Sequence, residues 1–125
     1  MKIEYISEGP VDCPLLRLFD YWMDEIEQLR LISLDLAEGR TTELALHDQP
    51  WIDPVAGCRF IWRIDTKDIG VRMPENDAPF VLAFSDEAWR EAADKLLPFA
   101  QGSSGHNWLT NEGEVNVLIT WDGLW

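Results

Sequence analysis

The chain has 125 residues, 46% of them hydrophobic, and carries 10 Lys and Arg against 23 Asp and Glu, for a formal net charge of −13 at pH 7. This length fits one domain over residues 1–125, and the hydrophobic content argues against a disordered chain. The charge argues against binding to nucleic acid phosphates and to anionic membrane surfaces, and it favours basic partners. Because no apolar run suits a membrane span or a signal peptide, we expect a cytoplasmic protein.

The N-terminal part of the chain predicts two strands followed by a helix. Residues 2–7 alternate in polarity, and residues 13–21 are apolar on both sides, which is typical of a covered strand. A helix is expected from Asp24 to about Glu38, with acidic residues in its first turn and Gly39 at its C-terminal cap. A competing interpretation makes residues 29–36 a strand. The expected core stripe of the helix, in steps of four and three, is Trp22, Ile26, Leu29, Ile32 and Leu36.

The back of this helix is acidic but carries two leucines. At 100° per residue these leucines fall opposite the core stripe. Either a second element covers them or they form a contact patch. The residues of this acidic back are Asp24, Glu27, Leu31, Leu34, Asp35 and Glu38.

The middle of the chain predicts four more strands and two irregular segments. The strands are expected over residues 41–47, 59–65, 70–73 and 80–84. Residues 49–57 are too rich in Pro and Gly for regular structure. Within that loop Trp51 is a candidate interface anchor, but it could equally tuck inward and cap the sheet.

A second helix and a terminal strand complete the prediction. Ser85 caps the helix, and Pro98 limits its regular part. Residues 101–105 read as a flexible link that leads into the last strand, at 114–122. This strand should be a well-covered member of the sheet, with one side formed by Val115, Val117, Ile119 and Trp121.

The predicted element order is therefore β-β-α-β-β-β-β-α-β. Strands joined by short turns favour antiparallel pairing. We therefore expect an α+β fold with one mainly antiparallel sheet of about six to seven strands and two helices packed on one face.

Residues that could carry chemistry are few and poorly placed for it. His47 lies near acidic residues, but only His106 remains to be recruited as another imidazole ligand, which argues against a metal site. Ser103 and Ser104 lie beside His106, yet the segment lacks the strand-turn-helix context of a nucleophile elbow. The sequence therefore predicts no catalytic residue, no cofactor and no metal, which favours a protein that is not an enzyme.

Two cysteines, Cys13 and Cys58, are too few for a disulfide scaffold and lack metal-ligand spacing. The acidic neighbour of Cys13 disfavours a reactive thiolate. Whether the two cysteines are bridged stays open.

Size, acidity and the lack of catalytic groups favour a non-enzymatic interaction protein that binds a basic protein, in the manner of an immunity protein or antitoxin. An alternative is a small-molecule-binding domain or minor enzyme with a tryptophan-lined pocket between sheet and helices. A homodimer could form through the sheet edge or the C-terminal Leu124 and Trp125. The expected partner-binding residues are Asp24, Glu27, Leu31, Leu34, Asp35, Glu38 and Trp51.

Overall fold

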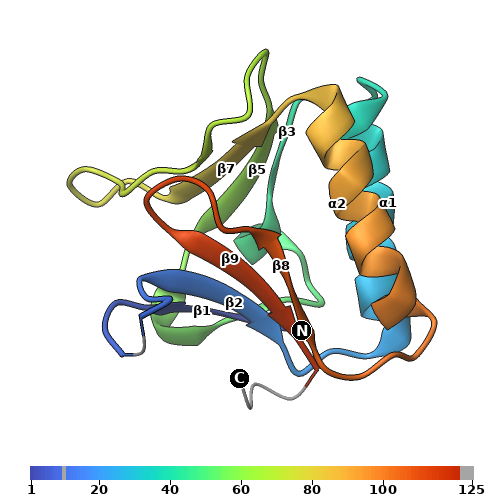
Figure 1. Cartoon of the computed structure of the whole chain (residues 1–125), viewed down its shortest axis with the longest axis horizontal. Coiled ribbons are helices and arrows are strands. Elements are labelled where there is room, and N and C mark those ends of the chain that lie inside the picture. The colour runs from blue at the N-terminus through green and yellow to red at the C-terminus, as the bar shows by residue number, and fades with distance from the viewer. Residues whose placement is uncertain (10, 122–125) are drawn as a thin grey trace.

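Strands far apart in the sequence pair in the computed structural model, which describes residues 1–9 and 11–121. One sheet of this described part has the order β4-β1-β2-β9-β8 (Figure 1). Its strands are β1 (Lys2–Ile6), β2 (Leu15–Phe19), β4 (Asp53–Pro54), β8 (His106–Thr110) and β9 (Asn116–Thr120).

The second sheet has the order β3-β5-β7-β6. Its strands are β3 (Glu43–Ala45), β5 (Phe60–Ile64), β6 (Gly70–Val71) and β7 (Phe80–Phe84). A single bridge between Val71 and Val115 links its edge to the segment that enters β9.

The fold is α+β, but the expectation of one mainly antiparallel sheet is wrong. β1 pairs with β4, β2 with β9, and β5 with β7, all in parallel. The short connections along the chain led us to expect hairpins. However, β2 and β9 are joined through almost the whole chain, so no local turn determines their relative direction.

Both helices lie side by side on one side of the strands (Figure 1). They are α1 (Met23–Ala37) and α2 (Asp86–Ala100). The predicted first helix is confirmed to within one residue at each end, and the strand interpretation of residues 29–36 is wrong. Ser85 caps α2 by accepting a hydrogen bond from the Ala88 N–H at 3.4 Å. The helix continues through Pro98 to Ala100, further than expected.

Helical and strand periodicity predict the core inside each element but fail at the ends. Ile26, Leu29 and Leu36 are fully buried in α1, as Val117 and Ile119 are in β9. The two tryptophans that were assigned to these buried faces are exposed instead.

The exposed fractions are 77% for Trp22 and 38% for Trp121. Trp22 is the N-cap of α1, where the backbone is still extended (φ −88°, ψ 158°), and Trp121 follows the last residue of β9. Neither side chain is therefore held on the buried face by the regular backbone.

Some strand boundaries and two whole strands also differ from the prediction. β4 (Asp53–Pro54) lies within the segment 49–57 that was expected to be irregular. The expected strand at 41–47 ends at Ala45 and gives way to a 3₁₀ turn, η1 (Leu46–Asp48). A second 3₁₀ turn, η2 (Val55–Gly57), lies in the Pro- and Gly-rich loop. The segment after the flexible link is a separate strand, β8, which pairs antiparallel with β9.

A close backbone contact fixes the loop between β8 and β9 against β6. Gly70 has φ +72°, and a Cβ atom built there would lie 2.6 Å from the Glu112 carbonyl oxygen. Only glycine fits both the positive φ and this contact. The contact holds Glu112 at the edge of a pocket described below.

Candidate functional site

The acidic back of α1 faces outward from the fold. Asp24, Glu38 and Leu31 are exposed, Leu31 to 46%, so no element of the described chain covers that leucine. Leu34 is half-buried at the flank, as are Glu27 and Asp35. The expected contact patch is therefore accessible around Leu31.

Arginines on α1 and just after it neutralise part of this acidic surface. Arg30 donates to Glu27 with an Nε–Oε2 distance of 2.8 Å, and this hydrogen bond lowers the pKa of Glu27. Arg40 donates to Asp35 at 2.7 Å and also pairs with Glu38. The neighbouring helix α2 adds further exposed acidic residues, so that the helical layer as a whole stays acidic. These are Asp86, Glu87, Glu91 and Asp94.

Trp51 lies apart from this surface. Its side chain is half-buried and packs against the core, which is the inward placement among the two alternatives. Its carbonyl oxygen accepts a hydrogen bond from the Met1 ammonium group at 3.0 Å. The Met1 ammonium group thus links Trp51 to Glu25 of α1, and no contact links Trp51 to the acidic back of that helix within the described residues.

A hollow of about 530 Å³ opens where α1 begins, which we call the aromatic hollow. Tyr21 and Trp121 meet edge to face in its wall, with ring centroids 5.5 Å apart. Trp22 contributes the most exposed ring. The lining residues are Met1, Asp20, Tyr21, Trp22, Glu25 and Trp121.

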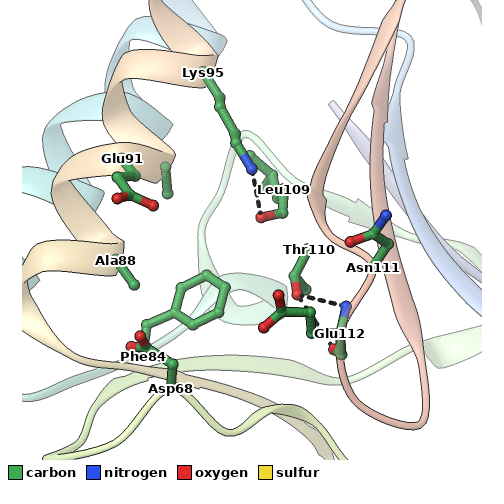
Figure 2. Close-up of a pocket in the computed structure, with 10 residues that line it drawn as sticks. Asp68, Phe84, Ala88, Glu91, Lys95, Leu109, Thr110, Asn111 and Glu112 are labelled. Atoms are coloured by element: carbon green, nitrogen blue, oxygen red, sulfur yellow. Dashed lines mark hydrogen bonds between the residues drawn. The ribbon is translucent and has the colours of Figure 1, made fainter.

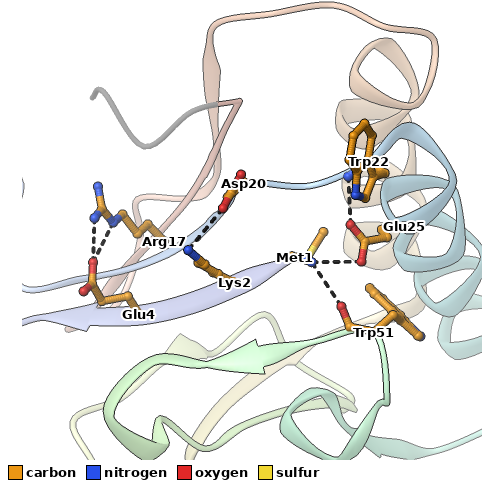
Figure 3. Close-up of polar contacts among 8 residues, drawn as sticks. All are labelled: Met1, Lys2, Glu4, Arg17, Asp20, Trp22, Glu25 and Trp51. Carbon is orange, nitrogen blue, oxygen red and sulfur yellow. Dashed lines mark hydrogen bonds and ion pairs between the residues drawn. The ribbon is translucent and has the colours of Figure 1, made fainter.

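Glu25 organises the wall of the aromatic hollow (Figure 3). One of its carboxylate oxygens accepts from the Trp22 backbone N–H at 2.8 Å, and the other lies 2.9 Å from the Met1 ammonium group. Because an indole has no acceptor, Trp22 cannot complete the reciprocal half of a capping box. Glu25 alone therefore caps α1 and holds Met1, the residue before β1.

Asp20 presents a second carboxylate to the aromatic hollow. Its Oδ2 atom lies 3.2 Å from the Lys2 ammonium nitrogen, and the exposed fractions of the two side chains are 63% for Asp20 and 42% for Lys2 (Figure 3). Its backbone is in the left-handed region at φ +52°. The Asp20 N–H donates to the Trp121 carbonyl at 3.3 Å, which ties the two sides of the hollow together.

A smaller pocket of about 130 Å³ lies between α2 and the loop that follows β8 (Figure 2). Lys95 reaches across it and donates to the Leu109 carbonyl at 3.3 Å. Thr110 Oγ1 accepts from the Glu112 N–H at 3.1 Å. Figure 2 shows Glu91 on α2 and Glu112 on the loop with their carboxylates on opposite sides of the space.

The lining of this small pocket contains no tryptophan within the described chain. The small-molecule alternative requires a tryptophan-lined pocket between sheet and helices, and this pocket does not have that lining. Its volume is also below the ~300–1,000 Å³ of typical ligand sites.

A third hollow, of about 390 Å³, lies between the loops around η2 and the loop before β7. Tyr5 and Phe80 stack in its wall with ring centroids 4.6 Å apart. Cys58 also lines it, but burial and the nearby Glu4 carboxylate raise the pKa of its thiol to about 11. At neutral pH this thiol is protonated and a poor nucleophile. Cys13 and Cys58 are both free thiols, so no disulfide joins them.

The two histidines do not form a site together. His47 Nδ1 accepts from the Phe60 backbone N–H at 2.9 Å, which gives the ring a structural role in joining η1 to β5. His106 is exposed at the start of β8. Within residues 1–9 and 11–121, no group of three or more His, Cys, Asp or Glu side chains is arranged to hold a metal ion. No helix in these ranges combines the length and apolar character needed to cross a membrane.

The sequence prediction missed the aromatic hollow, although a signal for it was present. Asp20, Tyr21 and Trp22 form an acidic and aromatic run between a strand and a helix, where side chains are not committed to a periodic face. Comparison of the chain with protein-family models, curated proteins and solved structures finds no match.

Proposed function

We propose that this protein is a non-enzymatic interaction protein whose outer helical surface binds a basic protein partner. The single observation that carries the proposal is the exposed Leu31 in the middle of an acidic helix, with Asp24 and Glu38 exposed at either end. An apolar centre with a charged rim is typical of a protein-binding surface.

The net charge of −13 supports the same proposal. Complementary charge speeds association with a basic partner and disfavours acidic competitors. The acidic residues of α2 extend the field over the neighbouring helix. Glu27, Asp35 and Glu38 contribute less because Arg30 pairs with Glu27 and Arg40 pairs with both Asp35 and Glu38.

A concrete form of this proposal is an immunity-like or antitoxin-like protein that blocks a basic toxin, such as a nuclease. A nuclease carries a positive surface for phosphates, and an acidic protein can cover that surface. This form rests on size and charge rather than on a motif. Its specific expectation is that a stoichiometric amount of the protein inhibits the activity of the captured partner.

The test is capture of a partner from lysate of the source organism, followed by affinity measurements with the purified pair. The expected partner is basic and elutes as salt rises from about 50 to 500 mM, because the Debye length shortens over this range. An acidic partner, or one retained equally at both salt concentrations, would contradict the proposal.

A matched pair of variants tests the surface itself. Asp24→Lys with Glu38→Lys reverses one exposed charge in the first turn of α1 and one at its C-cap. It removes the pair of Glu38 with Arg40 and leaves Asp35 paired with Arg40. We expect roughly tenfold weaker binding at low salt. The control, Glu75→Lys with Asp77→Lys, makes the same change in net charge on the exposed loop before β7. Equal weakening by both pairs would point to net charge alone and remove α1 as the contact surface.

A further inference from the structure

We propose that the aromatic hollow binds the guanidinium group of an arginine side chain on the basic partner. This inference rests on the proposed function, since it names the side chain through which that partner is recognised. It concerns a part of the molecule that the acidic back of α1 does not include.

The hollow offers the two kinds of group that a guanidinium requires. Its planar cation stacks on the face of an indole, and Trp is the best aromatic for this contact. Trp22 is 77% exposed, and Trp121, which also lines the hollow, makes an edge-to-face contact with Tyr21. The N–H groups of the same guanidinium can donate to a carboxylate, and Asp20 lines the hollow.

The two carboxylates in the hollow differ in availability. Glu25 uses one oxygen for the Trp22 N–H and the other for the Met1 ammonium group. Asp20 pairs with Lys2 at 3.2 Å, and the Asp20 side chain is 63% exposed and that of Lys2 42%. Because the Asp20 carboxylate is mostly in solvent, this ion pair contributes little, and an incoming arginine can displace Lys2 from Asp20.

The charge of the protein favours a cation over other occupants. A free anion would be attracted to the positive end of α1, but Glu25 already occupies that position and the whole chain repels it. A purely apolar occupant would leave the Asp20 carboxylate facing apolar groups at the mouth. The volume of about 530 Å³ lies within the range of ligand sites.

The experiment is a titration of the full chain with Nα-acetyl-arginine amide, followed by NMR of the tryptophan indole N–H signals. Nα-acetyl-citrulline amide serves as the control, since it has nearly the same shape without the charge. We expect the arginine probe to shift the Trp22 and Trp121 signals with saturation, and the citrulline probe to shift them at least several-fold less. Equal responses to both probes would overturn the proposal.

Three variants make the test specific to the hollow. Asp20→Asn should weaken arginine binding several-fold, and Trp22→Ala should abolish saturation at the Trp121 signal. Lys2→Gln should strengthen binding, because it removes the cation that competes for Asp20. Asp77→Asn, on the exposed loop before β7, should change nothing. Unchanged affinity in both Asp20→Asn and Lys2→Gln would overturn the assignment of Asp20.

Two other occupants would show themselves in the same experiment. Shifts of the Trp22 signal that depend on protein concentration without probe would mean a second copy of the chain. Residues 122–125, including Leu124 and Trp125, lie outside the described residues. A chain that ends at Trp121 and binds the probe more than tenfold tighter would identify its own last residues as the occupant. Either result would overturn the proposal.

Failure of this inference is distinguishable from failure of the proposed function. If the arginine probe is preferred but Asp24→Lys with Glu38→Lys leaves capture unchanged, the helical surface is wrong and the hollow stands. If capture depends on α1 and on salt but the two probes behave alike, the hollow is wrong and the proposed function stands.

Discussion

Two pairs of tryptophans have opposite roles in the same small protein: Trp62 of β5 with Trp89 of α2, and Trp22 before α1 with Trp121 after β9. Trp62 and Trp89 are fully buried, with ring centroids 4.9 Å apart, and Phe84 packs against Trp89 at 5.2 Å. Trp22 and Trp121 are exposed around a hollow. The buried pair lies inside regular elements, whereas the exposed pair lies just beyond element ends. For these two pairs, position relative to the ends of an element separates the tryptophans that build the core from those that remain exposed.

The largest effect should come from Trp89→Ala. This substitution removes a fully buried side chain that contacts Trp62 and Phe84, and whose Nε1–H donates to the Arg63 carbonyl at 3.0 Å. We expect a loss of about 3–5 kcal/mol in the free energy of unfolding, from lost burial and the cavity left behind. Urea denaturation followed by far-UV circular dichroism measures it.

A conservative variant separates packing from the hydrogen bond. Trp89→Phe keeps an aromatic ring but removes the donor to Arg63, so its loss should be clearly smaller than that of the alanine variant. A loss below 1 kcal/mol for Trp89→Ala would contradict the distinction between the buried and the exposed tryptophans, because Trp89 would then not stabilise the core.

An intermediate effect should come from Glu25→Gln in the wall of the aromatic hollow. The substitution leaves the buried Met1 ammonium group without its anionic partner at 2.9 Å. We expect a loss of about 1–3 kcal/mol in the free energy of unfolding, since an unpaired buried charge is costly. Thermal or urea denaturation measures the loss.

Asp24→Asn is the matched control, because it neutralises the adjacent, exposed carboxylate. It should change stability by less than about 0.5 kcal/mol. If both variants lost the same stability, the effect would belong to the charge at the start of α1 rather than to the contact with Met1. The contact between Glu25 and Met1 would then not stabilise the wall of the aromatic hollow.

The sequence predicted the helices well because their signals are local. The 3.6-residue period of Ile26, Leu29 and Leu36 and the Ser85 cap each act within a few residues. The sheet arrangement was not predictable in the same way, since β2 and β9 pair across most of the chain. β8 was missed because its first residues, His106 and Asn107, are polar and exposed.

The candidate sites likewise differ in whether local sequence signals or long-range pairing determines them. The acidic back of α1 could be predicted because it is a face of one helix. The aromatic hollow is lined by the residue before β1, the link before α1, the first turn of α1 and the residue after β9. Its formation therefore depends on the pairing of β2 with both β1 and β9. Extending the periods of α1 and β9 by one residue also placed Trp22 and Trp121 in the core. The error arose where regular backbone geometry stops.

The smallest effect on stability should come from Trp22→Ala. The ring is mostly in solvent, and the N-cap contact with Glu25 is made by the backbone N–H, which alanine retains. We therefore expect the free energy of unfolding to change by less than about 0.5 kcal/mol, measured by the same urea denaturation as for Trp89→Ala. A loss above 1 kcal/mol would mean that Trp22 contributes to the fold. An unchanged stability together with lost arginine binding would separate the role of Trp22 from that of Trp89, because a residue that matters for binding but not for folding is held at the surface for its ligand.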